Sequence, residues 1–207
     1  MTIFYIVRHG QTTANAQDLK QGTINTAITH LNAVGEQQAQ ALQAAFDISF
    51  ADRLICSPLA RTQETAAILN HGRGLPIKTD DRLLEISYGQ WDGQQNAKLK
   101  AAYPQYFDQA LQDVLPSYVE VATKGERFEQ VVARARDFLT TTAQQFPTEK
   151  IIVVTHGFTV KAMALAVLQP TDTMSIPEPE NTSVTKITVE PTLKRAFLTY
   201  YNRQVGY

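Results

Sequence analysis

The chain has 207 residues, 43% of them hydrophobic, which is enough to build the core of one compact domain. Its 19 lysines and arginines against 20 aspartates and glutamates give a formal net charge of −1, which argues against a broad nucleic-acid surface and a polybasic membrane anchor. The single cysteine excludes an intrachain disulfide, and the longest apolar run, 162–168, is too short to span a bilayer. We expect one cytoplasmic domain over residues 1–207, with no nucleic-acid or membrane partner and an oligomeric state left open.

Strand-like and helix-like segments alternate along the chain. Apolar runs that are too short for helices predict buried strands at 3–7, 53–56 and 150–155. Apolar residues at helical spacing predict helices at 35–46, from 57 to about 70, 94–114 with a break at Pro104, 126–146 and 157–168. Two final strands, at 183–189 and 196–201, are typical of a hairpin. This order predicts a doubly wound α/β domain of three layers, with helices on both faces of a mostly parallel sheet.

Polar residues indicate where two of these helices begin. Asn32 is expected to cap the helix over 35–46, because its side-chain oxygen can accept a hydrogen bond from a free backbone N–H. Ser57 and Pro58 are expected to be the N-cap and the first position of the helix after the second strand.

Two histidines directly follow predicted strands. His9 comes after the first strand and His156 after the strand at 150–155, and each is followed by glycine. In open α/β sheets, ligands bind beyond the carboxyl ends of the strands. One histidine at such a place is more often structural, but two in equivalent places, one of them next to Arg8, favour a functional site.

Arg61 adds a second guanidinium to this set. It lies in the first turn of the predicted helix after the second strand, and helix N-termini attract anions. Together with Arg8 it suits bidentate contact with a tetrahedral phosphate. The alternative is a surface ion pair of Arg61 with Glu64 or Asp52.

The stretch 7–15, V-R-H-G-Q-T-T-A-N, resembles the R-H-G-x-T-x-x-N signature of the histidine phosphatase superfamily. This family includes the cofactor-dependent phosphoglycerate mutases and many small-molecule phosphatases. Its other blocks follow in order: S-P-L-A-R-T-Q-E-T-A at 57–66, L-E-I at 84–86 with Gly89, Trp91 and Gly93, V-T-H-G at 154–157, and P-E-N-T-S at 179–183. The resemblance covers nearly the whole chain and implies a phosphoglycerate mutase-like fold.

The resemblance also implies roles for single residues. His9 is implied as the nucleophile that forms a phosphohistidine; it must be neutral to attack, so the nearby arginines should lower its pKa. Glu85 fits the proton donor, which requires a pKa raised toward neutrality, and its alternative role is that of a capping carboxylate. The residues implied or considered as phosphate or substrate contacts are Arg8, Asn15, Gln21, Arg61 and His156.

Phosphatase chemistry is favoured over mutase chemistry by two features. A chain of 207 residues leaves little room for the insertions that mutases carry, and L-E-I-S-Y-G-Q-W-D-G around Glu85 resembles the phosphatase branch rather than N-E-R-x-Y-G. We therefore expect a metal-independent phosphomonoester hydrolase for a small phosphorylated metabolite, with no cofactor required. A phosphoglycerate mutase and a phosphate-binding regulatory module of low activity are the alternatives.

The segment near 94–125 is expected to cap the site, and no motif identifies the substrate.

Other polar and aromatic residues carry weaker signals. His30 and His71 lack partners at metal-ligand spacing, so no metal site is expected. Tyr88 and Trp91 are predicted to pack in the core. Asn181 either orders the catalytic face or serves in a turn.

Overall fold

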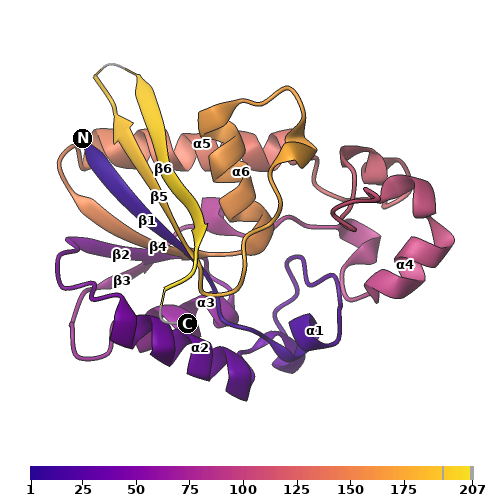
Figure 1. Cartoon of the computed structure of the whole chain (residues 1–207), viewed down its shortest axis with the longest axis horizontal. Coiled ribbons are helices and arrows are strands. Elements are labelled where there is room, and N and C mark those ends of the chain that lie inside the picture. The colour runs from indigo at the N-terminus through magenta and orange to yellow at the C-terminus, as the bar shows by residue number, and fades with distance from the viewer. Residues whose placement is uncertain (193, 206–207) are drawn as a thin grey trace.

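The computed structural model describes residues 1–192 and 194–205, in which a six-stranded sheet lies between helices (Figure 1). The strands are β1 (Thr2–Arg8), β2 (Arg53–Cys56), β3 (Ile77–Thr79), β4 (Lys150–Thr155), β5 (Val184–Glu190) and β6 (Arg195–Arg203). Their spatial order is β3-β2-β4-β1-β5-β6, and the first four run parallel. Only β5 runs against the others, since it is antiparallel to both of its neighbours. The predicted mostly parallel sheet and the C-terminal hairpin are confirmed.

Four helices form the two outer layers. On one face lie α2 (Ala33–Ala45) and α3 (Ala60–Leu69), and on the other α5 (Phe128–Gln145) and α6 (Gly157–Leu168) (Figure 1). The shorter helices are α1 (Thr13–Ala16) and α4 (Asn96–Ala102), with single turns of 3-10 helix at 27–29, 81–83, 89–91, 104–106, 116–120 and 173–175. No helix in the described part of the chain is long and apolar enough to cross a membrane.

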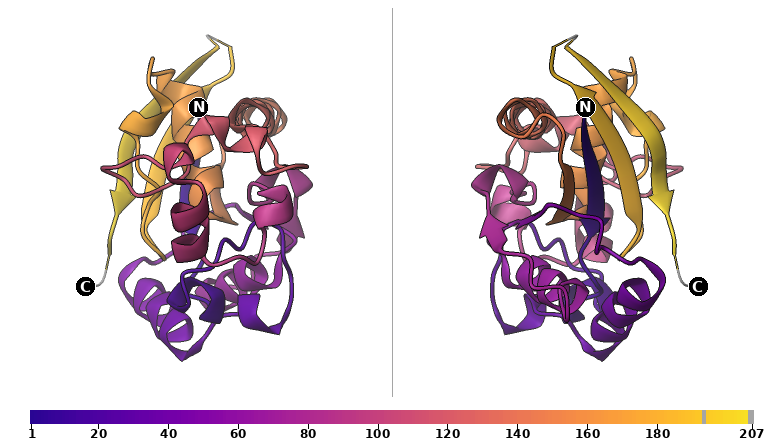
Figure 2. Two further views of the ribbon diagram at one scale, coloured as in Figure 1. Left: turned by 90° about the vertical axis from the view of Figure 1, so that its right-hand side faces the viewer. Right: turned by 90° about the vertical axis from the view of Figure 1, so that its left-hand side faces the viewer.

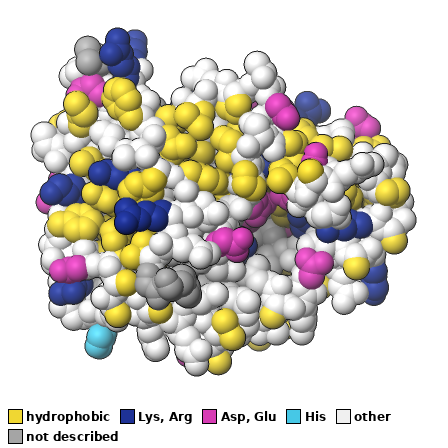
Figure 3. Space-filling view, viewed as in Figure 1, with side chains coloured by type: hydrophobic (Ala, Val, Ile, Leu, Met, Phe, Trp, Pro, Cys, Tyr) yellow, Lys and Arg dark blue, Asp and Glu magenta, His cyan; other side chains and the backbone are white. Residues whose placement is uncertain are grey.

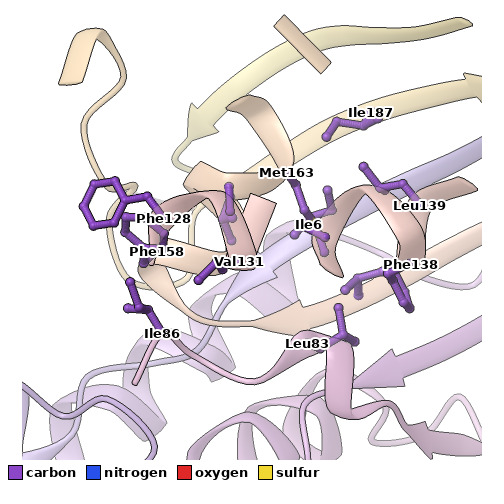
Figure 4. Close-up of a cluster of buried hydrophobic side chains, with 14 of the residues drawn as sticks. Ile6, Leu83, Ile86, Phe128, Val131, Phe138, Leu139, Phe158, Met163 and Ile187 are labelled. Atoms are coloured by element: carbon purple, nitrogen blue, oxygen red, sulfur yellow. The ribbon is translucent and has the colours of Figure 1, made fainter. Parts of the chain in front are cut away.

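Alternation along the central strands supplies both layers of the core. In β1, Phe4 and Ile6 face α5 and α6, whereas Val7 packs with residues of α2 and α3. The amphipathic stripe of α5, including Val131 and Phe138, covers the first of these faces (Figure 4). Because both faces are covered, the central strands read as continuous apolar runs in the sequence, which is why they could be predicted.

The start of α2 agrees with the prediction, whereas the start of α3 does not. The side chain of Asn32 accepts a hydrogen bond from the backbone N–H of Gly35 (2.9 Å), as an N-cap does. The N-cap of α3 is Leu59, without a side-chain hydrogen bond, so the predicted capping role of Ser57 is wrong. The Ser57 hydroxyl is instead engaged by the ring of His156, at 2.8 Å.

The helix predicted over 94–114 is also wrong for most of its length. Of this range only α4 is α-helical, because a residue before proline avoids the α region, and Tyr103, which precedes Pro104, has a non-helical backbone (φ −136°, ψ 51°). Beyond it the chain forms a loop closed by a bridge between Phe107 and Val114. The Phe107 ring stacks on Trp91 with centroids 5.8 Å apart and 8° between planes. Burying this ring against Trp91 holds the chain in a loop where apolar spacing alone suggested a helix.

The segment 94–125 forms a lobe at the end of the sheet where the parallel strands finish (Figures 1 and 2). Its start is tied to the loop after α1, since Lys20 N–H donates to the Gln94 carbonyl and Asn96 N–H to the Asp18 carbonyl, both at 2.9 Å. A segment predicted to cap the site therefore lies next to the loop that carries Gln21.

Trp91 should hold this lobe to the sheet body. It is 3% exposed and contacts Tyr103, Phe107 and Tyr118, so we expect Trp91→Ala to lower the free energy of unfolding by about 3–5 kcal/mol. Urea denaturation measures this change. The control is Phe197→Ala, which removes a ring that is 48% exposed and should cost no more than about 0.5 kcal/mol. Equal losses in the two variants would contradict the anchoring role.

Candidate active site

A cavity of about 430 Å³ opens between the sheet body and the 94–125 lobe and is visible as a hollow in Figure 3. It lies where β1 ends, and the sequence-predicted residues that line it are Arg8, His9, Asn15, Gln21, Arg61 and Glu85. The remaining predicted residue, His156, is fully buried and is not among the residues that line the cavity.

Parallel pairing of β1 with β4 brings the two histidines together. Arg8 lies opposite Thr155 in the register, and the His9 backbone N–H donates to the Thr155 carbonyl at 2.9 Å. The two imidazole rings are 5.3 Å apart between centroids and meet edge to face, at 66°. Asn181 donates its side-chain N–H to the His9 carbonyl (2.8 Å), so this residue helps to fix the backbone at His9 rather than serving only in a turn.

The ring of His9 is held in one tautomer. Its Nδ1 lies 2.7 Å from the Gly10 carbonyl oxygen, which can only accept, so Nδ1 carries the proton. Nε2 therefore keeps its lone pair. Burial lowers the pKa of His9 well below its usual value, and the charges of Arg61 and Arg8 lower it further. The expected effect of the arginines is present, with burial as the larger cause.

Arg61 is a fully buried cation whose partners are largely uncharged. Its Nη2–H donates to the Gly22 carbonyl (2.8 Å), its Nη1–H to the Ile24 carbonyl (3.0 Å) and its Nε–H to Nδ1 of His156 (3.1 Å). Burial lowers its pKa to about 10, which still leaves it charged at neutral pH. Three of its five N–H groups are used in this way, and two remain for an anion in the cavity.

The surface ion pair considered as an alternative for Arg61 does not form. Glu64 contacts the His30 ring and accepts from the Leu31 backbone N–H (2.9 Å). Asp52 accepts from the Lys150 backbone N–H (2.8 Å) at the opposite end of the sheet, where β2 and β4 begin.

His156 is hydrogen-bonded to Arg61 and helps to orient its guanidinium. Because its Nδ1 accepts from Arg61, its Nε2 carries the proton and donates to the Ser57 hydroxyl at 2.8 Å. Burial, followed by the charge of Arg61, lowers the pKa of His156 well below its usual value. The structure thus makes His156 a neutral ring that orients a guanidinium.

Arg8 donates one hydrogen bond, and its other guanidinium N–H groups have no partner among the described residues. Its Nη1–H donates to the Pro179 carbonyl (2.5 Å), whereas its buried Nε finds no partner among the described residues. Gly157 allows this crowding, since a Cβ there would lie 3.2 Å from the Arg8 guanidinium carbon and 2.3 Å from Oε2 of Glu178. The glycine after His156 therefore makes room for charged side chains.

Glu85 serves as a capping carboxylate, one of the two roles considered for it, and its role as proton donor stays a prediction. Its carboxylate accepts from the backbone N–H groups of Phe158 (3.2 Å) and Thr159 (3.1 Å), in the first turn of α6, and so caps that helix. The same side chain, 9% exposed, lines the cavity.

Asn15 and Gln21 are both oriented by Thr12. The Asn15 side-chain oxygen accepts from the Thr12 backbone N–H at 3.1 Å, and the Gln21 side-chain oxygen lies 2.9 Å from the Thr12 hydroxyl. With their oxygens engaged, the two amides keep their NH₂ groups to donate into the cavity that they line.

Further residues line the cavity that sequence reasoning did not assign to it, among them Lys20, Tyr88, Asp113 and Glu178. Lys20 and Asp113 form an ion pair at 2.9 Å, which no spacing in the sequence suggests. Glu178 directly precedes the P-E-N-T-S block, and that adjacency was the only available signal. Tyr88 is buried as predicted and in addition contributes to the wall. In the described part of the chain no group of three or more His, Cys, Asp or Glu side chains is arranged to hold a metal ion.

The pKa of His9 should depend on Arg61. In Arg61→Met an unbranched apolar side chain takes the place of the charged one, so this variant should raise the pKa of His9. Arg8→Ala should raise the pKa of His9 by less. Ring titration by NMR between pH 4 and 8 measures both. Arg82→Gln, which alters a distant surface ion pair, is the control. A His9 pKa that is unchanged in Arg61→Met would contradict this account.

Gly22 should be needed for anion binding. It has φ +50° and its carbonyl holds Arg61, and a Cβ would lie 1.8 Å from Oδ1 of Asp92. Gly74 has a similar φ of +72° with nothing within 4 Å, so Gly74→Ala is a matched control for backbone strain. We expect only Gly22→Ala to weaken the binding of inorganic phosphate, by roughly tenfold or more, as measured by calorimetry. An equal loss in both variants would show that strain alone is responsible.

Known proteins resemble this chain in both sequence and structure. The sequence model of the histidine phosphatase superfamily (branch 1) matches residues 4–202. The uncharacterized phosphatase PhoE of Bacillus subtilis is 31% identical over 164 residues, covering 79% of this chain and 76% of that protein. The 2,3-bisphosphoglycerate-dependent phosphoglycerate mutase of Rhizobium etli is 31% identical over 189 residues, covering 86% and 87%. The solved structure of Bacillus stearothermophilus YhfR matches with a TM-score of 0.85 at 29% identity, over 99% of this chain and 98% of that one.

These matches confirm the family and the fold that the motifs predicted. The match to the family extends over nearly all of the described residues, and the fold similarity includes both the sheet and the lobe. The chain belongs to the histidine phosphatase superfamily, branch 1.

Proposed function

We propose that this protein is a phosphatase that hydrolyses phosphomonoesters of small metabolites through a phosphohistidine at His9. The observation that carries the proposal is the state of the His9 ring. Its Nδ1 proton is held by the Gly10 carbonyl, its Nε2 lone pair is available, and its lowered pKa keeps it neutral beside two arginines.

In the first step the substrate phosphate is bound by the free N–H groups of Arg8 and Arg61 and by the amide of Asn15. Nε2 of His9 attacks the phosphorus while the bond from phosphorus to the alcohol oxygen breaks. Glu85 gives its proton to that oxygen, and the alcohol leaves. The Nδ1–H bond to Gly10 stabilises the charge that develops on the ring.

In the second step water replaces the alcohol. The Glu85 carboxylate takes a proton from the water, whose oxygen attacks the phosphorus while the bond to Nε2 breaks. Inorganic phosphate leaves, His9 is again neutral, and Glu85 again carries its proton. Neither step uses a metal ion or a cofactor, and we propose that the enzyme needs neither.

Mutase activity is the second candidate, since a phosphoglycerate mutase is as similar in sequence as PhoE. The two activities share the first step and differ in whether water or a second substrate takes the phosphoryl group. The Glu85 block, L-E-I-S-Y-G, supports the phosphatase. A regulatory module without turnover has no use for a nucleophile and a proton donor in one cavity.

Hydrolysis of p-nitrophenyl phosphate in EDTA at pH 5 to 8 tests the proposal. We expect turnover in the wild type and a loss of roughly 10³-fold or more in His9→Ala, with His71→Ala, which removes an exposed histidine, as the control. Mass spectrometry of the enzyme denatured in alkali should find a phosphoryl group on His9. No turnover across that pH range would refute the phosphatase, and turnover that survives in His9→Ala would refute the mechanism.

Conversion of 3-phosphoglycerate to 2-phosphoglycerate in the presence of 2,3-bisphosphoglycerate, faster than phosphate release, would assign the mutase.

A further inference from the structure

The cavity extends beyond the residues proposed to bind phosphate. We call this part the outer half; the residues used in the argument are Lys20, Tyr88, Asn96, Asp113 and Glu178. It lies between the sheet body and the lobe, where Figure 3 shows both acidic and basic side chains around the hollow. In a phosphatase with the phosphate between Arg8 and Arg61, the alcohol part of the substrate occupies this half.

The positive charge of Lys20 in the outer half is already balanced. Its ammonium lies 2.9 Å from Oδ1 of Asp113 and 4.7 Å from the centre of the Tyr88 ring. Both members of the ion pair are well buried, with side-chain exposures of 10% and 18%. Breaking a pair of this kind to bind a second anion would leave the Asp113 carboxylate buried without a counter-charge.

Two acceptors in the outer half lack a donor. The partly buried carboxylate of Glu178 accepts no hydrogen bond and joins no ion pair among the described residues, although it is pressed against the start of α6 at Gly157. The amide of Asn96 is oriented by its donation to Oδ1 of Asp18 (2.6 Å), which leaves its buried Oδ1 without a partner in the same part of the chain. A buried acceptor such as Oδ1 of Asn96 normally finds a donor, so a ligand that supplies one fits here.

Charges of both signs lie near Glu178, and the negative ones have the larger effect on its pKa. Burial, followed by the carboxylates of Asp113 and Glu85, raises the pKa of Glu178 to about 8, while the charges of Arg8 and Lys20 lower it by less. A positively charged group in the outer half would offset this repulsion, whereas a negatively charged group would add to it.

We propose that the alcohol part of the substrate carries a positively charged hydrogen-bond donor, such as an ammonium group, which Glu178 and Asn96 bind. This inference rests on the proposed phosphatase function and names its substrate class: phosphomonoesters of small amino alcohols. By the same argument, a second phosphate or a carboxylate placed next to Glu178 is selected against.

Three two-carbon phosphates of nearly equal size test the charge directly. They are phosphoethanolamine, ethylene glycol monophosphate and phosphoglycolate, whose second groups are cationic, neutral and anionic. We expect kcat/KM to fall in that order, by roughly tenfold from the first to the second. In Glu178→Gln, which keeps the shape and removes the charge, the ratio of kcat/KM for the first two substrates should approach one. Glu36→Gln, which removes an exposed carboxylate on α2, should leave this ratio unchanged.

A preference for phosphoglycolate, or an equal rate with the cationic and neutral compounds, would overturn the inference. So would a preference for phosphoethanolamine that persists in Glu178→Gln. Hydrolysis of p-nitrophenyl phosphate, run in parallel, separates this failure from that of the proposed function. If that compound is hydrolysed while the order of the three is reversed, the phosphatase stands and only the substrate class is wrong.

Discussion

The buried guanidinium of Arg61 is the interaction on which the rest of the candidate site depends. A charge removed from water is tolerated only when its hydrogen bonds are satisfied, and here two backbone carbonyls and the ring of His156 do so. These partners come from the loop after α1 and from the end of β4, while Arg61 itself begins α3. The hydrogen bonds of one cation therefore connect three segments that are distant in the sequence, and they leave two of its N–H groups unused at the wall of the cavity.

The two histidines share the same buried surroundings but differ in their hydrogen bonds. Both rings are neutral because burial and nearby arginines lower their pKa values. Their hydrogen-bond partners then decide what each can do, since a carbonyl on Nδ1 leaves Nε2 of His9 free, whereas both nitrogens of His156 are occupied. One ring is thus available for chemistry and the other is a support, although they occupy equivalent places at the ends of neighbouring strands.

The lobe brings a different kind of constraint to the site. Its base is packed through Trp91 and Phe107, and its loop is joined to the sheet body by the ion pair of Lys20 with Asp113. The residues proposed to bind phosphate lie on the sheet body, whereas the outer half of the cavity combines the lobe with Glu178 from the segment before β5. A fold can in this way keep one phosphate chemistry while changing the alcohol that it accepts.

What the sequence determined by itself was set by local patterns. The buried strands could be predicted from apolar runs, and the start of α2 from Asn32. Seven candidate site residues were named from the sequence, and six of them line one cavity. Only the tertiary structure decided the role of Ser57, the loop after Pro104 and the place of Glu178 in the cavity. Each of these depends on a partner far away in the chain, namely His156, Trp91 and Gly157. Local spacing carries the preferences of neighbouring residues, but a hydrogen bond or a buried ring is settled by whichever distant group the fold brings within reach.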